Sequence, residues 1–488
     1  MKDQAFLHKL YIGGEWRDGT ATKQLDVKNP FNHELITTFK LGSKKDIDDA
    51  YKAAAKAQPA WRALPPQAKR QFFEKAWQWV EAHHDELVEY LTKEGGSTRL
   101  KAEFELGLVA DFMRSTSALT MAPVGSILAS PDPEKENRLY QEPVGVVGVI
   151  SPFNAPFFLS LRPILPALAL GNAVVVKPHS MTPIMSGTMI ARMFDECGLP
   201  AGLVNVVPAN VEEIGDEFIE HPIPQVIAFT GSSPTGKHIS EVAGRHLKKV
   251  VTELGGNSAL VVLDDADLET AVNAAVFSRF THSGQICMSA NRVIVDEKVH
   301  DEFVKRYVEK VASLPIGDPS DPSVIVGPLI NVQQAVLLES QIKEAVEHGA
   351  VEALAAKPRD GDSALCTPTV LTGVTVDNPV SQVELFGPAA SIMKAKDEAD
   401  AVRIANATPY GLSGSVHSTN VERAVQVGRQ INTGMVHINN ATIADEAAVP
   451  FGGVGASGNG RLNGAASIDA FTRTLWVSVH HGKARFPY

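Results

Sequence analysis

One of the three cysteines stands in a sequence setting that suits a catalytic nucleophile. Cys287 lies in the segment Gly284-Gln-Ile-Cys287-Met-Ser289, between a helical pattern and a strand-like run. A turn that contains glycine exposes both the thiol and its own backbone N–H, a geometry that can stabilise an oxyanion. A lone cysteine is also commonly a small buried hydrophobic residue, and Cys197 and Cys366 fit that description. His282 would indicate a cysteine–histidine hydrolase, but the stretch offers no orienting partner.

Three polar residues come at or after strand-like runs and are candidates for the same site. Glu253 ends the apolar run before Leu254-Gly-Gly-Asn257, where a buried carboxylate is costly without a purpose or a partner. Asn154 follows another run, and Glu384 precedes Leu385-Phe-Gly-Pro388. Each also has a simpler interpretation, as a solvated strand end, a turn former or an exposed acid. Taken singly, none of the three decides the function.

A glycine-containing loop resembles a nucleoside-triphosphate P-loop in all but one position. The segment Gly231-Ser-Ser-Pro-Thr-Gly236-Lys237-His238 has histidine where a P-loop needs serine or threonine to hold Mg²⁺. A neutral imidazole is a poor ligand for that hard cation, which disfavours an NTPase. The small residues still let backbone amides and a helix N-terminus approach a phosphate, as a dinucleotide would require. No G-x-G-x-x-G fingerprint follows the early strands.

The elements that must position these residues follow an α/β pattern. Near-continuous Val/Ile runs are typical of strands buried on both faces of a parallel sheet. The first set of runs covers 144–150, 173–176, 204–207 and 226–229, with helices expected at 161–170 and 183–197. A second set begins with 260–263 and 292–295 and extends towards Asn439, with helices at 268–280 and 301–313. We therefore expect two doubly wound α/β domains, joined near residues 254–257.

The two ends of the chain differ from this pattern. Ser43 with Asp46 three positions later predicts a helix start, and a second amphipathic helix is expected at about 67–83, so the N-terminal part reads as helical. Residues 130–138 and a strand at 472–479 look peripheral, and terminal strands of this kind often pair with another subunit.

Composition excludes several classes of protein. The 488 residues predict two or three domains, and the net charge of −11 disfavours nucleic-acid or anionic-membrane partners. Three scattered cysteines support neither a disulfide framework nor a metal site, which indicates a reducing cytoplasm. The N-terminus lacks the apolar core of a signal peptide. The uncharged run 143–161 contains three prolines and therefore does not read as a membrane span.

Taken together and in this order, the segments resemble the aldehyde dehydrogenase superfamily over about residues 11–479, and within it the bacterial benzaldehyde and vanillin dehydrogenases. The motifs that carry the resemblance are Ser151-Pro-Phe-Asn154, Val175-Val-Lys177-Pro178, Phe229-Thr-Gly231-Ser232, Glu253-Leu-Gly-Gly256, Gly284-Gln-Ile-Cys287, Glu384-Leu-Phe386-Gly-Pro388 and Pro450-Phe-Gly-Gly453. The resemblance implies an NAD(P)-binding domain at 1–120 and 140–252 and a catalytic domain at 253–445. It also implies a small β oligomerisation arm at 121–139 and 465–488, used to form a homodimer or homotetramer.

The resemblance implies a role for each catalytic candidate. Cys287 would attack the aldehyde carbonyl, and Asn154 with the Cys287 amide would hold the oxyanion. Hydride transfer to the nicotinamide would leave a thioester, which Glu253 would hydrolyse by activating water. Acyl-transferring relatives generally lack this glutamate, so Glu253 favours release of a free carboxylic acid.

The implied cofactor is NAD or NADP. Many NAD-preferring relatives follow Lys-Pro-Ser with Glu, but this chain reads Lys177-Pro-His-Ser180, so that a 2′-phosphate would meet no like charge and could pair with Lys177. The residues carried over as cofactor-binding are Ser151, Phe153, Lys177, Ser180, Gly231, Ser232, Leu254, Glu384 and Phe386.

The substrate pocket is expected to suit an aromatic aldehyde. Its predicted residues are Phe158, Arg162, Ile286, Met288 and Phe451. Phenylalanine and methionine suit a flat apolar ring. Arg162 keeps a succinate-semialdehyde dehydrogenase open, because an arginine there can hold a distal carboxylate. A homologue without catalysis, used for structure or binding, is the alternative of another class.

Overall fold

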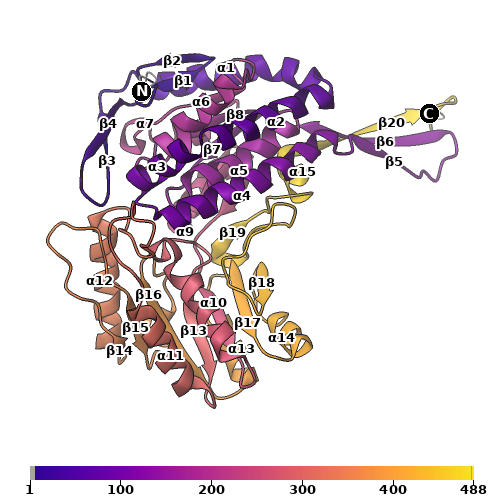
Figure 1. Ribbon diagram of the computed structural model, residues 1–488. Helices are drawn as coiled ribbons and strands as arrows, with labels where there is room; N and C mark the ends of the chain where they lie inside the picture. The colour runs from indigo at the N-terminus through magenta and orange to yellow at the C-terminus, as the bar shows by residue number, and fades with distance from the viewer. Residues whose placement is uncertain (1–5, 485) are drawn as a thin grey trace.

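The computed structural model describes residues 6–484 and 486–488, so that the first five residues of the expected cofactor domain and residue 485 of the expected arm lie outside it. Two sheet-centred lobes lie one above the other, and a narrow ribbon of strands extends away from them (Figure 1). The expected fold class is confirmed: each lobe is an α/β unit built on a mainly parallel sheet, and a small β arm is attached.

The first lobe is built on a sheet whose five central strands are parallel. Its order is β19 (Gly458–Asn459), β11 (Lys249–Glu253), β10 (Val226–Thr230), β7 (Val146–Ile150), β8 (Ala173–Lys177), β9 (Val204–Val206), β1 (Leu10–Ile12) and β2 (Glu15–Arg17). The four apolar runs predicted for this region are all strands of it. They are buried on both faces, which explains why they are continuous rather than alternating.

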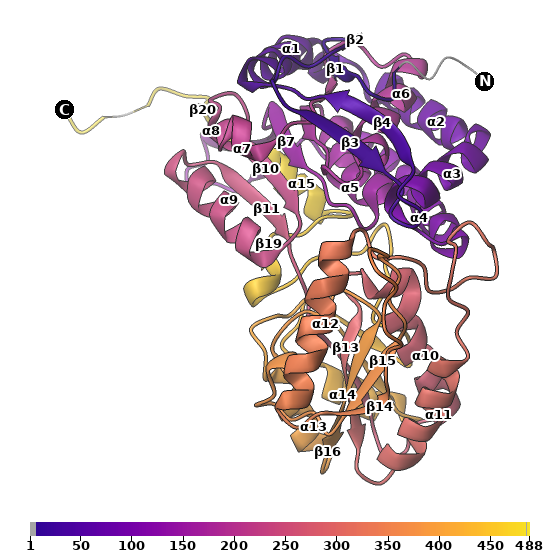
Figure 2. The same ribbon diagram turned by 90° about the vertical axis from the view of Figure 1, so that its left-hand side faces the viewer.

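Helices cover this sheet (Figures 1 and 2). They are α1 (Lys44–Ala63), α2 (Pro66–Ala82), α3 (His84–Gly95), α4 (Arg99–Ser117), α5 (Pro156–Ala169), α6 (Met189–Glu196), α7 (Val211–Ile214), α8 (Glu217–Glu220) and α9 (Ser233–Arg245). The predicted helix start is confirmed, since the Ser43 N–H donates to Asp46 Oδ2 over 2.9 Å. The predicted helix 183–197 begins as a π-helical turn, Ile184–Thr188, before α6.

The prediction that the N-terminal part is helical is wrong for residues 10–40. This segment forms β1, β2 and a hairpin of β3 (Gln24–Lys28) and β4 (Leu35–Lys40), which Figure 2 shows crossing the first lobe. β1 is buried throughout but is only three residues long. β2, β3 and β4 have few fully buried positions, so their sequences carry no clean apolar alternation.

The second lobe contains a parallel sheet with one antiparallel edge strand. Its order is β14 (Val351–Leu354), β15 (Thr369–Thr372), β16 (Ala389–Ala395), β13 (Ala290–Asp296), β12 (Ser258–Val262), β17 (Ser413–His417) and β18 (Met435–Ile438). Its helices are α10 (Leu268–Phe280), α11 (His300–Ala312), α12 (Val332–Glu347), α13 (Glu398–Asn406) and α14 (Val421–Gly428). The predicted strands and helices of this region are confirmed at the positions expected. β11 ends at Glu253 and β12 begins at Ser258, so the chain passes from one lobe to the other at the pair Gly255-Gly256.

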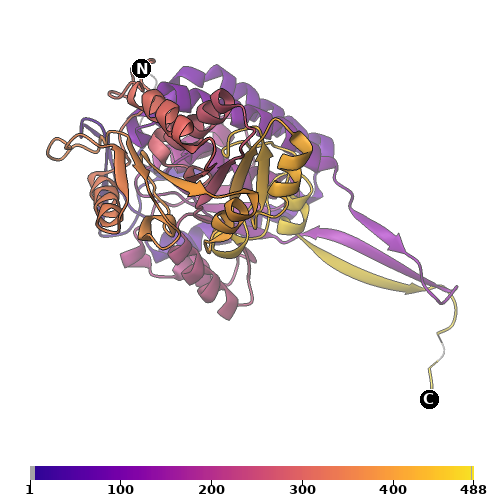
Figure 3. The same cartoon turned by 90° about the horizontal axis from the view of Figure 1, so that it is seen from below.

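The arm consists of three antiparallel strands in the order β20 (Thr472–His480), β6 (Lys135–Pro143) and β5 (Gly125–Leu128). Its strand β20 follows α15 (Ala466–Phe471), and the arm extends clear of both lobes, as the view from below shows (Figure 3). The terminal strand is confirmed, and β6 continues to Pro143, past the expected boundary at 139. No helix among the described residues is long and apolar enough to cross a membrane; the uncharged run 143–161 instead contains β7 and the start of α5.

Candidate active site

Cys287 is held by a tightly wound turn between α10 and β13. Three successive residues, His282, Ser283 and Gly284, have positive φ angles of 51°, 54° and 77°. Such angles are unfavourable outside glycine, so buried contacts must hold the turn. Ser283 Oγ donates to the Gly327 carbonyl over 2.8 Å, and Gln285 Oε1 accepts from the Ile330 N–H over 2.9 Å. The turn therefore fixes the backbone that carries the thiol.

The three thiols differ in exposure. Cys197 and Cys366 are buried among apolar residues, whereas Cys287 is partly exposed and lines two cavities. Desolvation, followed by the nearby carboxyl groups of Glu384 and Glu253, raises the pKa of the Cys287 thiol to about 12. The thiol is thus protonated at neutral pH in the free protein and needs a base when it reacts.

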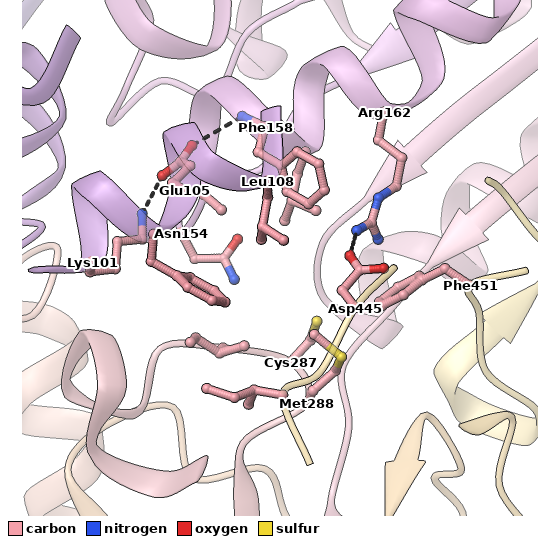
Figure 4. Close-up of a pocket in the computed structure, with 15 residues that line it drawn as sticks. Lys101, Glu105, Leu108, Asn154, Phe158, Arg162, Cys287, Met288, Asp445 and Phe451 are labelled. Carbon is pink, nitrogen blue, oxygen red and sulfur yellow. Dashed lines mark hydrogen bonds and ion pairs between the residues drawn. The ribbon is translucent and has the colours of Figure 1, made fainter. Parts of the chain in front are cut away.

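Asn154 and Cys287 lie where two cavities meet. Asn154 follows β7, directly before α5, and its side chain is buried. Asn154 and Cys287 line both a large cavity of about 1680 Å³ and a small pocket of about 560 Å³, where both volumes count space open to solvent. In Figure 4 both side chains face the small pocket. A molecule in either cavity can therefore reach the same thiol.

Glu253 is a buried carboxyl group at the end of β11. It is 4% exposed, and in the described part of the chain neither side-chain oxygen has a hydrogen-bond partner. Burial raises its pKa to about 8, although Arg162 and Arg461 act in the opposite direction. It lines the large cavity beside Cys287. An unpaired carboxyl group in this position is available as a base.

Glu384 lies across the large cavity on the segment before β16. Its Oε1 accepts the Gly256 N–H over 3.1 Å, and burial raises its pKa to about 7. Arg279 of α10, which the sequence reading missed, donates to the Leu385 and Gly387 carbonyls and so fixes this segment. No motif marks Arg279, because these two carbonyl partners lie more than 100 positions away.

The large cavity matches what a dinucleotide needs. Ser232 caps α9, which starts at the cavity and directs unpaired backbone N–H groups towards it, and Lys177 supplies positive charge at the end of β8. Glu384 offers carboxylate oxygens to hydroxyl groups, so the donor and acceptor set fits phosphates together with a ribose. All nine residues predicted to bind the cofactor line this cavity, namely Ser151, Phe153, Lys177, Ser180, Gly231, Ser232, Leu254, Glu384 and Phe386. Their contact with a cofactor stays a prediction.

Two features of this cavity bear on the sequence alternatives. His238, at the position a P-loop would give to a Mg²⁺-binding hydroxyl, pairs through Nε2 with Asp216 Oδ1 at 2.8 Å. Ser180 is exposed, and burial lowers the pKa of Lys177 to about 8. Sequence reading missed several lining residues that belong to no motif, including Val211, Ile214, Asp216, Gln334 and Leu337.

The small pocket is lined mainly by apolar side chains. All five residues predicted for it line the pocket, namely Phe158, Arg162, Ile286, Met288 and Phe451. Figure 4 labels all of them except Ile286. Sequence reading missed Lys101, Phe104, Glu105, Leu108, Ile443 and Asp445. The Arg162 guanidinium carbon lies 4.7 Å from the Phe158 ring centroid and 3.9 Å from that of Phe451.

A buried pair on α4 sets the position of α5. Glu105 Oε1 accepts the N–H groups of Phe157 and Phe158 over 2.9 and 3.0 Å, and its other oxygen pairs with Lys101 at 2.5 Å. A carboxylate at a helix N-terminus satisfies unpaired donors and complements the helix dipole. In the sequence, Lys101 and Glu105 form only an i,i+4 pair of opposite charges. Such pairs are common on exposed helices, so the sequence did not indicate this buried contact.

Comparison with known proteins agrees with this geometry. The profile of the aldehyde dehydrogenase family matches residues 16–477. A benzaldehyde dehydrogenase of Bacillus subtilis is 50% identical over 482 residues, 99% of each chain. A vanillin dehydrogenase of Corynebacterium glutamicum is 45% identical and covers 96% of this chain and 97% of its own.

Solved structures give the same result. An NAD-dependent benzaldehyde dehydrogenase from Corynebacterium glutamicum superposes with a TM-score of 0.90 at 41% identity, over 99% of this chain and 98% of that one. An NADP-dependent enzyme of E. coli has a TM-score of 0.95 at 32% identity, over 98% and 100%. The expected cofactor, NAD or NADP, agrees with relatives of both kinds. The chain belongs to the aldehyde dehydrogenase family and is an enzyme of that family.

Proposed function

We propose that this enzyme oxidises an aromatic aldehyde to the carboxylic acid through a covalent intermediate on Cys287. The observation that carries the proposal is that a dinucleotide-sized cavity and a small apolar pocket meet at Cys287 and Asn154. An aldehyde in the small pocket and a cofactor in the large cavity would then approach one carbonyl carbon from two sides.

The first step is addition of Cys287 to the carbonyl. A bond forms between Sγ and the carbonyl carbon, and the thiol proton passes to water in the large cavity, which Cys287 lines and which is open to solvent. The carbonyl oxygen becomes an oxyanion, held by the Asn154 amide and the Cys287 N–H. Loss of one such donor typically costs roughly 3–4 kcal/mol of transition-state stabilisation.

NAD or NADP, when bound in the large cavity, supplies the acceptor for the hydride that leaves this carbon. Lys177 and the N-terminus of α9 would hold its phosphates, and Glu384 its nicotinamide ribose, with Phe386 beside it. Asn154 and the Cys287 N–H keep the oxygen in place while the tetrahedral adduct becomes a thioester.

Glu253 then serves hydrolysis. Its carboxylate removes a proton from water as the water oxygen bonds to the thioester carbon. The carbon–sulfur bond breaks, the carboxylic acid leaves and the sulfur of Cys287 is free again. Burial without a partner supports this role, because it keeps the pKa of Glu253 near the working pH of a general base.

The substrate class rests on the small pocket. Its rings and aliphatic side chains suit a flat apolar ring, and relatives at 50% and 45% identity are named benzaldehyde and vanillin dehydrogenases. Arg162 is the residue for which succinate semialdehyde was considered as an alternative substrate. Its guanidinium already pairs with the Asp445 carboxylate. That pairing favours an aromatic aldehyde over the semialdehyde.

We also propose that the arm joins copies of the chain into a dimer or tetramer, and that the enzyme works in the cytoplasm. Exposed apolar residues on the arm, such as Ile127 and Trp476 at 69% and 59% exposure, support the first proposal. The three free cysteines support the second.

The test is an aldehyde screen with both cofactors, in which benzaldehyde, vanillin and succinate semialdehyde are compared by kcat/KM. We expect the aromatic aldehydes to be oxidised fastest, and Cys287→Ala to lose activity at least about a thousandfold. A clear preference for succinate semialdehyde would contradict the substrate class. Unchanged oxidation by Cys287→Ala would contradict the mechanism, and no cofactor reduction with any aldehyde would favour a homologue without catalysis.

A further inference from the structure

Arg162 is a buried cation inside an otherwise apolar pocket. Its side chain is 2% exposed and lies against the rings of Phe158 and Phe451. Nη2 pairs with Asp445 Oδ2, whereas Nε and Nη1 have no hydrogen-bond partner in the described part of the chain. A guanidinium with two unpaired nitrogens would be a ready receptor for a carboxylate if it carried its charge alone.

Asp445 prevents that. It lies on the segment after β18, and its side chain is 5% exposed. Asp445 Oδ1 accepts a hydrogen bond from Asn463 Nδ2 over 3.3 Å, and Oδ2 accepts one from the Arg162 guanidinium. The two hydrogen bonds together fix the orientation of the Asp445 carboxylate. In Figure 4 the pair spans one side of the pocket, between α5 and the ring of Phe451.

The other charged groups of the pocket offer no replacement cation. Lys101 pairs with Glu105, and both are fully buried. Glu253, close enough to Arg162 and Asp445 to feel their charges, would add negative charge when ionised. Across the described lining of the small pocket, each positive side chain is therefore matched by a negative one. An anionic substrate would gain no net attraction and would meet the Asp445 carboxylate directly.

We propose that Asp445 is a specificity-determining residue: by occupying Arg162, it makes the pocket accept neutral aldehydes and reject aldehydes that carry a distal carboxylate. The inference rests on the proposed function and deepens it. Rejection by a fixed like charge is a form of specificity that a purely apolar pocket cannot supply. A substitution at position 445 should therefore change the substrate class without changing the chemistry at Cys287.

The first experiment uses the unmodified enzyme and two aldehydes of the same ring and reactive group, para-formylbenzoate and its methyl ester. We expect kcat/KM to be at least about tenfold higher for the neutral ester, with most of the difference in KM. Calorimetric binding of the two compounds gives a second measurement that does not depend on turnover. Equal kcat/KM, or equal binding, would overturn the inference.

The second experiment exchanges the charge. Asp445→Asn keeps the side-chain shape, and we expect it to shift the preference towards para-formylbenzoate by at least about tenfold. Glu446→Gln is the matched control, because it removes the same charge one residue later on an exposed side chain and should leave the preference unchanged. Adding Arg162→Met to Asp445→Asn should abolish the gain, since the receptor is then absent.

Folding and the proposed function are controlled separately. Asp445→Asn leaves the buried Arg162 guanidinium without its counter-ion, which can unfold the protein. Asp445→Ser removes the same charge and is therefore made in parallel as a second variant. A folded variant at position 445 whose preference stays unchanged would overturn the inference. If the unmodified enzyme failed to oxidise benzaldehyde with either cofactor, the proposed function would fail, and calorimetry with the two formylbenzoates would still decide the role of Asp445.

Discussion

Gly256 lies directly against the backbone of Cys287: a Cβ atom at position 256 would come within 2.2 Å of the Cys287 carbonyl oxygen. The Gly256 N–H also donates to Glu384 Oε1 over 3.1 Å. One peptide thus contacts both the segment that carries the nucleophile and the carboxylate expected to hold the cofactor. The distance between the Cys287 segment and the Glu384 carboxylate is therefore set at Gly255-Gly256, where the chain passes from one lobe to the other.

Gly256→Ala should displace the Cys287 backbone and lower kcat by about a hundredfold, because displacements near 1 Å can cost that much in an active site. Steady-state rates at saturating aldehyde give the measurement. Gly244→Ala is the matched control, since position 244 lies in α9 with nothing within 4 Å of an added Cβ. Near-normal turnover by Gly256→Ala would show that the contact is not needed.

Asn154→Ala should lower kcat by about 10²–10³-fold, because the oxyanion would lose one of its two donors. Pre-steady-state formation of reduced cofactor should slow along with turnover, as addition to the carbonyl precedes both. Cofactor binding, followed by fluorescence titration, should change little. A loss of less than tenfold would exclude Asn154 from the oxyanion site.

Glu253→Gln should retain a burst of reduced cofactor but turn over slowly, since the thioester would form and then hydrolyse without a base. The parent enzyme should show kcat rising with pH through about 8, because the carboxylate form of Glu253 exists only above its pKa. The variant should lack this rise. Stopped-flow and steady-state measurements across pH 6–9 would test both, and an unchanged steady-state rate would refute the water-activating role.

The same residue predicts a pH-dependent stability. The pKa of Glu253 is raised on folding from 4.5 to about 8, so the fold is not penalised below pH 4.5 and loses stability as pH rises towards 8. Glu253→Gln removes this penalty. Its melting temperature should therefore match that of the parent near pH 4.5 and exceed it near pH 8.5, as calorimetry would reveal; the opposite order would mean that the buried group is stabilised when ionised.

NADP should be accepted, because position 180 carries no carboxylate and Lys177 can face a 2′-phosphate. Since the pKa of Lys177 is about 8, its positive charge is lost above that value, and the ratio of NADP to NAD efficiency should fall between pH 7 and pH 9. Ser180→Glu should reduce NADP efficiency by about tenfold or more through like-charge repulsion, with Ser180→Ala as the control. Rejection of NADP by a hundredfold or more in the parent would show this reasoning to be wrong.

The arm should be required for assembly. Ile127→Glu combined with Leu475→Glu places charges on its exposed apolar residues and should convert the proposed oligomer to a monomer in light-scattering measurements. Leu247→Glu makes the same kind of change at an exposed leucine outside the arm and should leave the mass unchanged. A doubly substituted protein with the parent mass would exclude the arm as the interface.

The sequence by itself determined the two α/β units, the confirmed strands and helices of the second lobe, and the candidates Cys287, Glu253 and Asn154. Continuous apolar runs and turn residues act over a few neighbouring positions, so they can be read locally. Only the tertiary structure decided what lies around those residues. The strands within residues 10–40 were missed because β2, β3 and β4 have few fully buried positions and no apolar alternation. Arg279, Glu105 and Asp445 acquired their positions from contacts more than 50 residues away. Charge pairing and cavity shape depend on such long-range packing, so a linear pattern could place Arg162 in the pocket but could not show that its charge is already taken.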